Sequence, residues 1–345
     1  MIPDKDKTPS PKRALWKPRR IWLFLLPVAA AYSTWFIHMV RFQLWPLFSH
    51  YFFMSITMVF GSFVAGASSE GGGSVAFPVM TLIFKIPPAQ ARDFSLAIQS
   101  VGMTAATLWI ITRRIPIERT YLILAMIGGS AGIILGTYFI APYTAPAYAK
   151  MLFVSFWLSF GITLFAVNYF RGRTVRDRLE KLTPFQKGEL IFIGMLGGIL
   201  SAILGSGIDI CTFAFVTMKY NLSEKVATPT SVILMASNAV LGFMLHHLVL
   251  ADIAPVVYNY WLVCIPVVLL GAPLGAFTIN RVPRLHIVNF LVLIILIQFV
   301  GAILILRPTG RLLTFSIGSF VAGIIIFFIL TAHSQRVKKA GGHIT

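Results

Sequence analysis

Residues 65–78 read AGASSEGGGSVAFP, a glycine-rich break between a long apolar segment and a short one. The long segment, 47–67, is of the length that spans a membrane, because about 20 apolar residues cross a bilayer as a helix. The short segment, 74–85, would rise only about 18 Å as a helix, less than a hydrocarbon core of about 30 Å. Unwound backbone at that depth persists only where it packs in protein or lines a wet cavity. The break therefore marks a candidate binding site inside a membrane protein.

The composition of the whole chain also indicates a membrane protein. Of its 345 residues, 57% are hydrophobic and 12% are charged, against about 45–50% and about 25% in soluble domains. Lysine and arginine outnumber aspartate and glutamate by 29 to 11, giving a net charge of +18. The basic residues form short clusters between apolar runs, which is a signal of membrane topology and not of a nucleic-acid surface. Soluble enzymes, secreted disulfide scaffolds and nucleic-acid-binding proteins are thereby excluded.

The two cysteines, Cys211 and Cys264, lie inside apolar segments and have no metal-ligand spacing. We interpret both as buried small hydrophobic residues. We therefore expect no metal and no cofactor.

Ten segments have the length and apolarity of full spans. They are 21–40, 47–67, 93–112, 120–140, 151–170, 188–205, 226–249, 257–279, 286–306 and 312–331. A second short apolar segment, 207–219, follows a second glycine break. The first span continues too far past Ala29-Ala30-Ala31 for a cleavable signal peptide. We therefore predict a signal-anchor helix behind a basic tail.

The charges decide whether the two short segments cross the membrane. If both cross, all but six of the 29 lysines and arginines lie on the cytoplasmic side. The six exceptions are Arg41, Lys85, Arg92, Lys150, Arg307 and Arg311. If both were re-entrant, the strongly basic loop 171–187 would face outward. We therefore predict that both short segments cross, with the N- and C-termini in the cytoplasm.

The two breaks belong to an internal repeat. Residues 65–103 align with 201–239 without a gap, pairing Gly71 with Gly207 and Ser95 with Ser231. Both copies have a long apolar helix, a glycine break, a short apolar piece, a polar loop and a helix that opens with Ser or Thr. The predicted topology gives the copies opposite orientations, an arrangement typical of secondary transporters.

The fold class we predict is an all-α polytopic membrane protein with two inverted-topology repeats, each holding a short glycine-interrupted half-helix. The chain divides into a basic cytoplasmic tail (1–20), the signal anchor (21–40), a first repeat (47–170), a basic linker (171–187), a second repeat (188–306) and a last span with a cytoplasmic tail (312–345).

These residues resemble the sulfite exporter TauE/SafE family of membrane proteins. The resemblance rests on residues 65–74 with Phe77-Pro78, and on residues 198–209 with 227–231. It covers roughly residues 45–305. It implies export of sulfite, of a sulfonate such as sulfoacetate, or of another small oxyanion across the bacterial inner membrane.

The residue types around the breaks suit an oxyanion. The first N–H groups of a helix lack partners and carry positive character, and we expect short helices to begin near Ser74 and Ile210. Glycines allow an anion-binding nest, and the amides of Gln99 and Asn238 each offer two donors. The candidate substrate-binding residues are Ser69, Gly71, Gly72, Gly73, Ser74, Gln99, Ser100, Gly205, Ser206, Gly207, Thr230, Ser231 and Asn238. The alternative is that the glycines permit tight helix crossing and the polar side chains bond between helices or to carbonyls.

Two acids, Glu70 and Asp209, stand at the breaks. An ionised acid at the bilayer centre costs about 2.5–3.5 kcal/mol, so one hypothesis is that either carries a proton coupled to anion movement. The alternatives are that Asp209 caps the following helix and that Glu70 lies exposed at the cytoplasmic entrance.

We predict a secondary transporter, and not an enzyme, that exports a small sulfur oxyanion or organosulfonate, with proton coupling left open. The alternatives are a passive anion channel and an uptake permease for another small anion. GSGID at 205–209 differs from the Gly-x-Gly-Asp signature of intramembrane aspartyl proteases, because Ile208 precedes the aspartate. No G-x-x-x-x-G-K-[ST] signature for nucleotide binding is present. Expected partners are a small anion, protons and anionic lipids at loop 171–187; whether a homodimer forms is left open.

Overall fold

The computed structural model describes residues 18–170, 173–180 and 182–341. Within these ranges the chain is helical and contains no β-strand, apart from one isolated bridge between Arg176 and Leu222. The predicted all-α polytopic class is confirmed. Most of the predicted basic tail lies outside the described residues.

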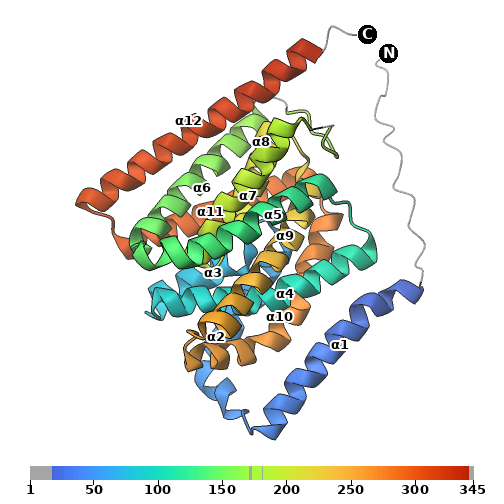
Figure 1. The fold of residues 1–345 in the computed structure, drawn as a ribbon, viewed down its shortest axis with the longest axis vertical. Coiled ribbons are helices and arrows are strands. Elements are labelled where there is room, and N and C mark those ends of the chain that lie inside the picture. The colour runs from blue at the N-terminus through green and yellow to red at the C-terminus, as the bar shows by residue number, and fades with distance from the viewer. Residues whose placement is uncertain (1–17, 171–172, 181, 342–345) are drawn as a thin grey trace.

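Twelve α-helices follow one another through the described chain (Figure 1). They are α1 (Pro18–Arg41), α2 (Pro46–Ala67), α3 (Gly71–Pro78), α4 (Pro88–Arg113), α5 (Arg119–Leu135), α6 (Pro146–Tyr169), α7 (Pro184–Leu204), α8 (Ile208–Lys219), α9 (Glu224–Met244), α10 (Pro255–Arg281), α11 (Arg284–Leu306) and α12 (Gly310–Gly341). Short irregular helical turns extend three of them: η1 (Val79–Ile83) after α3, η2 (Gly136–Ile140) and η3 (Ala141–Tyr143) after α5, and η4 (Leu245–Leu250) after α9.

Ten of these helices are long and apolar enough to cross a membrane, and they correspond one to one to the ten predicted spans. The two short segments are also helices, α3 with η1 and α8. The largest differences in where a span begins are at α4, which begins at Pro88, and α6, which begins at Pro146; each begins five residues earlier than predicted, because proline fits the first turn of a helix. As a result Arg92 and Lys150, which the prediction placed in outer loops, lie inside helices.

The helices of the two halves pack reciprocally. Helix α2 packs along α10 and α5 packs along α7, while α4 lies against α9 and α6 against α11. The close pairs meet at glycines. A Cβ on Gly66 would lie 1.8 Å from the Ala272 carbonyl oxygen, and one on Gly128 would lie 1.9 Å from that of Ile191. Only glycine permits backbones to approach this closely.

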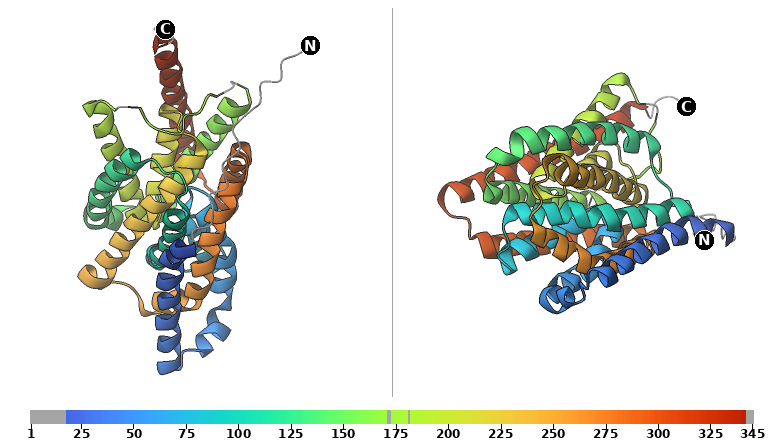
Figure 2. Two further views of the ribbon diagram at one scale, coloured as in Figure 1. Left: turned by 90° about the vertical axis from the view of Figure 1, so that its right-hand side faces the viewer. Right: turned by 60° about the horizontal axis from the view of Figure 1, so that its bottom comes forward.

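Two helices flank this core. Helix α1 lies along one edge against α4 and α10, and α12 lies along the opposite edge against α6 and α8 (Figures 1 and 2). The exposed large apolar side chains of α11 and α12, such as Ile297, Leu304 and Ile325, are typical of a surface that faces lipid. The short helices α3 and α8, by contrast, are mostly buried inside the bundle.

Candidate functional site

The first turns of the two short helices meet inside the bundle. Gly71 is the first residue of α3 and has a left-handed backbone, with φ at 61°. A Cβ at this position would lie 2.4 Å from Gln99 Oε1 and 2.8 Å from Asp209 Oδ2. Asp209 is the second residue of α8, and Gln99 belongs to α4. Segments more than 100 residues apart thus converge on one glycine, and we call Gly71, Gln99, Asp209 and Glu70 the central cluster.

Both short helices begin earlier than expected, α3 at Gly71 in place of Ser74 and α8 at Ile208 in place of Ile210. Gly72 and Gly73 therefore lie within the first turn of α3. Gly71 has a positive φ and follows Glu70 in the right-handed region, a backbone pattern that forms an anion-binding nest. Glycine permits a left-handed backbone but does not require one.

Glu70 is fully buried, so the alternative that it lies exposed at the cytoplasmic entrance is wrong. Trp157 of α6 donates its Nε1–H to Glu70 Oε1 at 2.9 Å, and Gln298 of α11 donates to Oε2. These helices come from distant parts of the sequence and cover the break. Gln298 was missed, although a single amide in the very apolar span α11 is a signal that could have found it.

Asp209 is equally buried, but its carboxylate receives no hydrogen bond from a side chain of the described residues. Within this part of the chain, only backbone amides of the first turn of α8 lie nearby. The N-cap of α8 is Gly207, so the expectation that Asp209 caps this helix is wrong. Ser201 supplies the acceptor instead, because its Oγ receives the Ile208 N–H at 3.1 Å. A carboxylate in the first turn is favoured by the helix dipole, yet a buried one without a donor is costly when ionised.

The two predicted amides bridge helices. Gln99 Nε2 donates to the carbonyl oxygens of Ser95 at 2.9 Å and Gly205 at 2.8 Å, which ties α4 to the second break. Asn238 Nδ2 donates to the Gly129 carbonyl oxygen at 3.0 Å and ties α9 to α5. The amide oxygens of both residues are buried and make no hydrogen bond within the described chain. In this conformation their N–H groups therefore bond to carbonyl oxygens between helices and not to an anion, which is the alternative stated above for the polar side chains.

The remaining predicted residues are distributed around this centre. Gly205 ends α7 in a left-handed conformation with φ at 79°, and Ser69 and Ser206 are buried beside the breaks. The hydroxyls of Ser100, Thr230 and Ser231 bond to carbonyl oxygens of their own helices at 2.6–2.8 Å. The side chain of Ser74 lies outside what the structure describes.

A buried lysine near the cluster was missed by the sequence analysis. Lys150, in the first turns of α6, is only 4% exposed. Its Nζ lies 5.6 Å from the ring centre of Phe77 and 5.4 Å from that of Phe153. Lys150 was interpreted as a loop residue because it stands at the edge of an apolar run. Pro146, a typical first-turn residue four positions earlier, is the signal that places it inside a helix.

Beside the central cluster lies a cavity of about 10 Å³, lined in part by Ser62, Gly72, Gln99 and Gly102. Such a volume holds about one water molecule.

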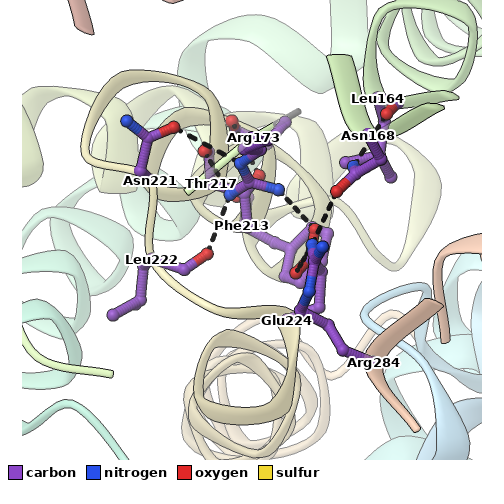
Figure 3. Close-up of polar contacts among 10 residues, drawn as sticks. Leu164, Asn168, Arg173, Phe213, Thr217, Asn221, Leu222, Glu224 and Arg284 are labelled. Carbon is purple, nitrogen blue, oxygen red and sulfur yellow. Dashed lines mark hydrogen bonds and ion pairs between the residues drawn. The ribbon is translucent and has the colours of Figure 1, made fainter. Parts of the chain in front are cut away.

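A second buried polar group lies at the ends of α6, α8, α9 and α11 (Figure 3). Glu224 pairs with Arg173 of the linker and with Arg284 of α11, the latter at 3.1 Å. Arg173 also donates to the carbonyl oxygens of Thr217 at 2.6 Å and Leu222 at 3.0 Å. Burial lowers the pKa of Arg173, and Glu224 opposes this shift. We call this group the linker junction; its polar groups are bonded to one another, which favours a structural role.

Ten apolar helices that surround buried polar residues between two interrupted segments define a polytopic membrane protein with a polar centre. The sequence profile of the family described as sulfite exporter TauE/SafE matches residues 54–300. Because this match covers well over half of the chain, the protein belongs to the TauE/SafE sulfite exporter family, a family of membrane transporters for sulfur anions. Helices α1 and α12 lie outside the matched region. No curated protein and no solved structure matched the chain.

Proposed function

We propose that this protein is a secondary transporter that exports a small sulfur oxyanion or organosulfonate across the bacterial inner membrane. The observation that carries the proposal is the convergence of Gly71, Gln99 and Asp209, where α3 and α8 both begin. Helix N-termini offer free N–H groups and positive dipole ends, which favour an anion. The substrate-binding residues proposed from the sequence border this point or lie on the helices that frame it.

The acids at this centre indicate how an anion and a proton are linked. A fixed negative charge beside an anion is unfavourable, and Asp209 competes with the substrate for the same first-turn amides of α8. Protonation of Asp209 removes both obstacles. Glu70 is the less suitable carrier because Trp157 and Gln298 already bind its carboxylate oxygens. We therefore assign the coupling proton to Asp209.

The reciprocal packing of the two halves supports the inverted-repeat division at 47–170 and 188–306. The first helix of each half, α2 or α7, packs against the fourth helix of the other, α10 or α5. In such folds one half moves against the other around a site shared by both. With both short helices crossing, the two termini lie in the cytoplasm.

The test is flux in proteoliposomes loaded separately with sulfite, sulfoacetate, taurine, sulfate or chloride, with and without a pH gradient. Saturable movement of sulfite or a sulfonate that responds to the gradient is the expected result. A passive channel would saturate poorly and ignore the gradient. Absence of flux for every sulfur anion, in protein shown to be folded, would contradict the proposed substrate.

A further inference from the structure

Lys150 is a buried cation that lacks a carboxylate partner. It is 4% exposed, and within the described chain no carboxylate oxygen lies within 4.0 Å of its Nζ. Its neighbours are the rings of Phe77 on α3 and Phe153 on α6. Glu70 acts on Lys150 electrostatically from farther away, but its oxygens already accept hydrogen bonds from Trp157 and Gln298. A buried charge is normally paired, because its desolvation is costly.

Another lysine of the same chain lies near two aromatic rings and also has a carboxylate partner. Lys219 also lies near two rings, with its Nζ 5.3 Å from the ring centre of Phe215 and 5.8 Å from that of Tyr220. Unlike Lys150, it forms an ion pair with Glu189 and is partly exposed. Lys219 therefore has the directly paired carboxylate that Lys150 lacks.

We propose that Lys150 is the cation that binds the transported anion, and that the centre selects anions with a single charge. This inference rests on the proposed function and names the substrate class of the same site. Lys150 projects from α6 onto α3, the short helix that begins at Gly71 in the central cluster. An anion that moves along α3 from the cluster therefore passes the ammonium group.

The selection for one charge follows from the ionisable groups that face the centre. Among the described residues near the centre they are the carboxyls of Glu70 and Asp209 and the ammonium of Lys150. Arg92, beside Gly205, is already paired with Asp93, which leaves Lys150 as the cation without a direct carboxylate partner. A singly charged sulfonate or hydrogen sulfite is neutralised by Lys150 alone. Sulfate and sulfoacetate, each with two charges at neutral pH, would leave one charge uncompensated in a buried site beside two acids. Because an ammonium is a point charge, it selects charge and not a particular oxyanion shape.

The experiment compares wild type with Lys150→Met, Lys150→Arg and the matched control Lys219→Gln in proteoliposomes and in detergent. The flux assay uses methanesulfonate and, separately, sulfate. We expect Lys150→Met to raise KM for methanesulfonate about tenfold or more, the loss typical of a charged hydrogen bond. Lys150→Arg retains the charge and recovers part of the affinity, and Lys219→Gln changes KM less than twofold. Wild type moves methanesulfonate in preference to sulfate.

Thermal unfolding in detergent separates binding from folding. Methanesulfonate raises the unfolding midpoint of wild type and of Lys219→Gln but not that of Lys150→Met. Without ligand, Lys150→Met unfolds at the wild-type temperature or above, because it removes an unpaired buried charge. An unchanged KM and an unchanged ligand-induced shift in Lys150→Met would overturn the assignment while the proposed function stood. Equal transport of sulfate and methanesulfonate by wild type would overturn the selection for one charge.

Discussion

At the scale of single residues, the side chains of the central cluster differ in whether they have hydrogen-bond partners. Glu70 and Asp209 are both fully buried acids at the start of short helices, but only Glu70 receives hydrogen bonds from side chains. Gln99 uses its N–H groups to hold the second break and leaves its oxygen facing Gly71. The result is a centre with acceptor oxygens that make no hydrogen bond within the described chain and with two helix N-termini beside them, the arrangement on which the proposed binding of a proton and an anion rests.

Asp209→Asn tests this linkage. The variant keeps the size of the side chain and removes its titration, so anion affinity is expected to lose its dependence on pH. If the protonated form of Asp209 binds the anion, as proposed above, wild-type affinity rises as pH falls, by up to about tenfold per pH unit for one linked proton. Methanesulfonate binding measured by calorimetry at several pH values shows the slope. Glu70→Gln serves as the control and should retain it; an unchanged slope in Asp209→Asn would exclude Asp209 as the linked group.

Gly71→Ala should damage the centre, whereas Gly72→Ala should not. The added methyl at Gly71 would meet Gln99 Oε1 at 2.4 Å and would occupy a left-handed backbone position. Strain of this kind costs about 1–3 kcal/mol. At Gly72 the nearest atom is Met58 Cε at 3.4 Å, an ordinary contact. The thermal midpoints of both variants decide the matter, and equal midpoints of the two would refute the close approach at Gly71.

At the scale of elements, hydrophobic length alone predicted the spans, because each buries or exposes to lipid a run of about 20 apolar residues. Several of the failures concern charged residues near helix ends. Lys150 and Arg92 lie inside helices because prolines start those helices early. Asp209 does not cap α8 because Ser201, from the preceding helix, already receives the first N–H. Such outcomes depend on partners supplied by other elements.

The burial of Glu70 shows that the local sequence around the site also does not reveal which distant helices cover it. No local pattern reveals that α6 and α11 would close over the first break and present Trp157 and Gln298 to it. The glycine pattern located both breaks, but which atoms meet there depends on contacts between segments more than 100 residues apart. Sequence reasoning therefore located the two breaks, and left the contacts that their residues make undetermined.

The linker junction gives a test at this scale. Glu224→Gln leaves Arg173 and Arg284 without their shared carboxylate in a buried setting, which typically costs about 3–5 kcal/mol. Glu180→Gln is a matched control, because Glu180 pairs with Arg176 in the same linker but is 74% exposed. Loss of an exposed pair costs about 0–1 kcal/mol. Thermal unfolding in detergent should show a large decrease for Glu224→Gln alone, and a small decrease in both would mean that the junction does not stabilise the fold.

At the scale of the whole molecule, the packing of the two halves is reciprocal, with α2 against α10 and α5 against α7. Reciprocal pairing is what two copies related by a two-fold axis produce. If that axis lies in the membrane plane, the short helices α3 and α8 leave the centre toward opposite sides. Both halves then contribute equally to a site that opens to one side at a time.

The side of the membrane on which each short segment ends therefore tests directly whether the two copies are inverted. Lys85 follows η1 and Lys225 lies just beyond α8, and both are exposed. In intact cells, a membrane-impermeant thiol reagent should label Lys85→Cys, while Lys225→Cys should react only after the membrane is opened. The native cysteines give little background, because Cys264 is buried and Cys211 lies inside the bundle on α8. Labelling of both positions from the same side would mean that the copies run parallel, and a site shared by two inverted halves would no longer describe this protein.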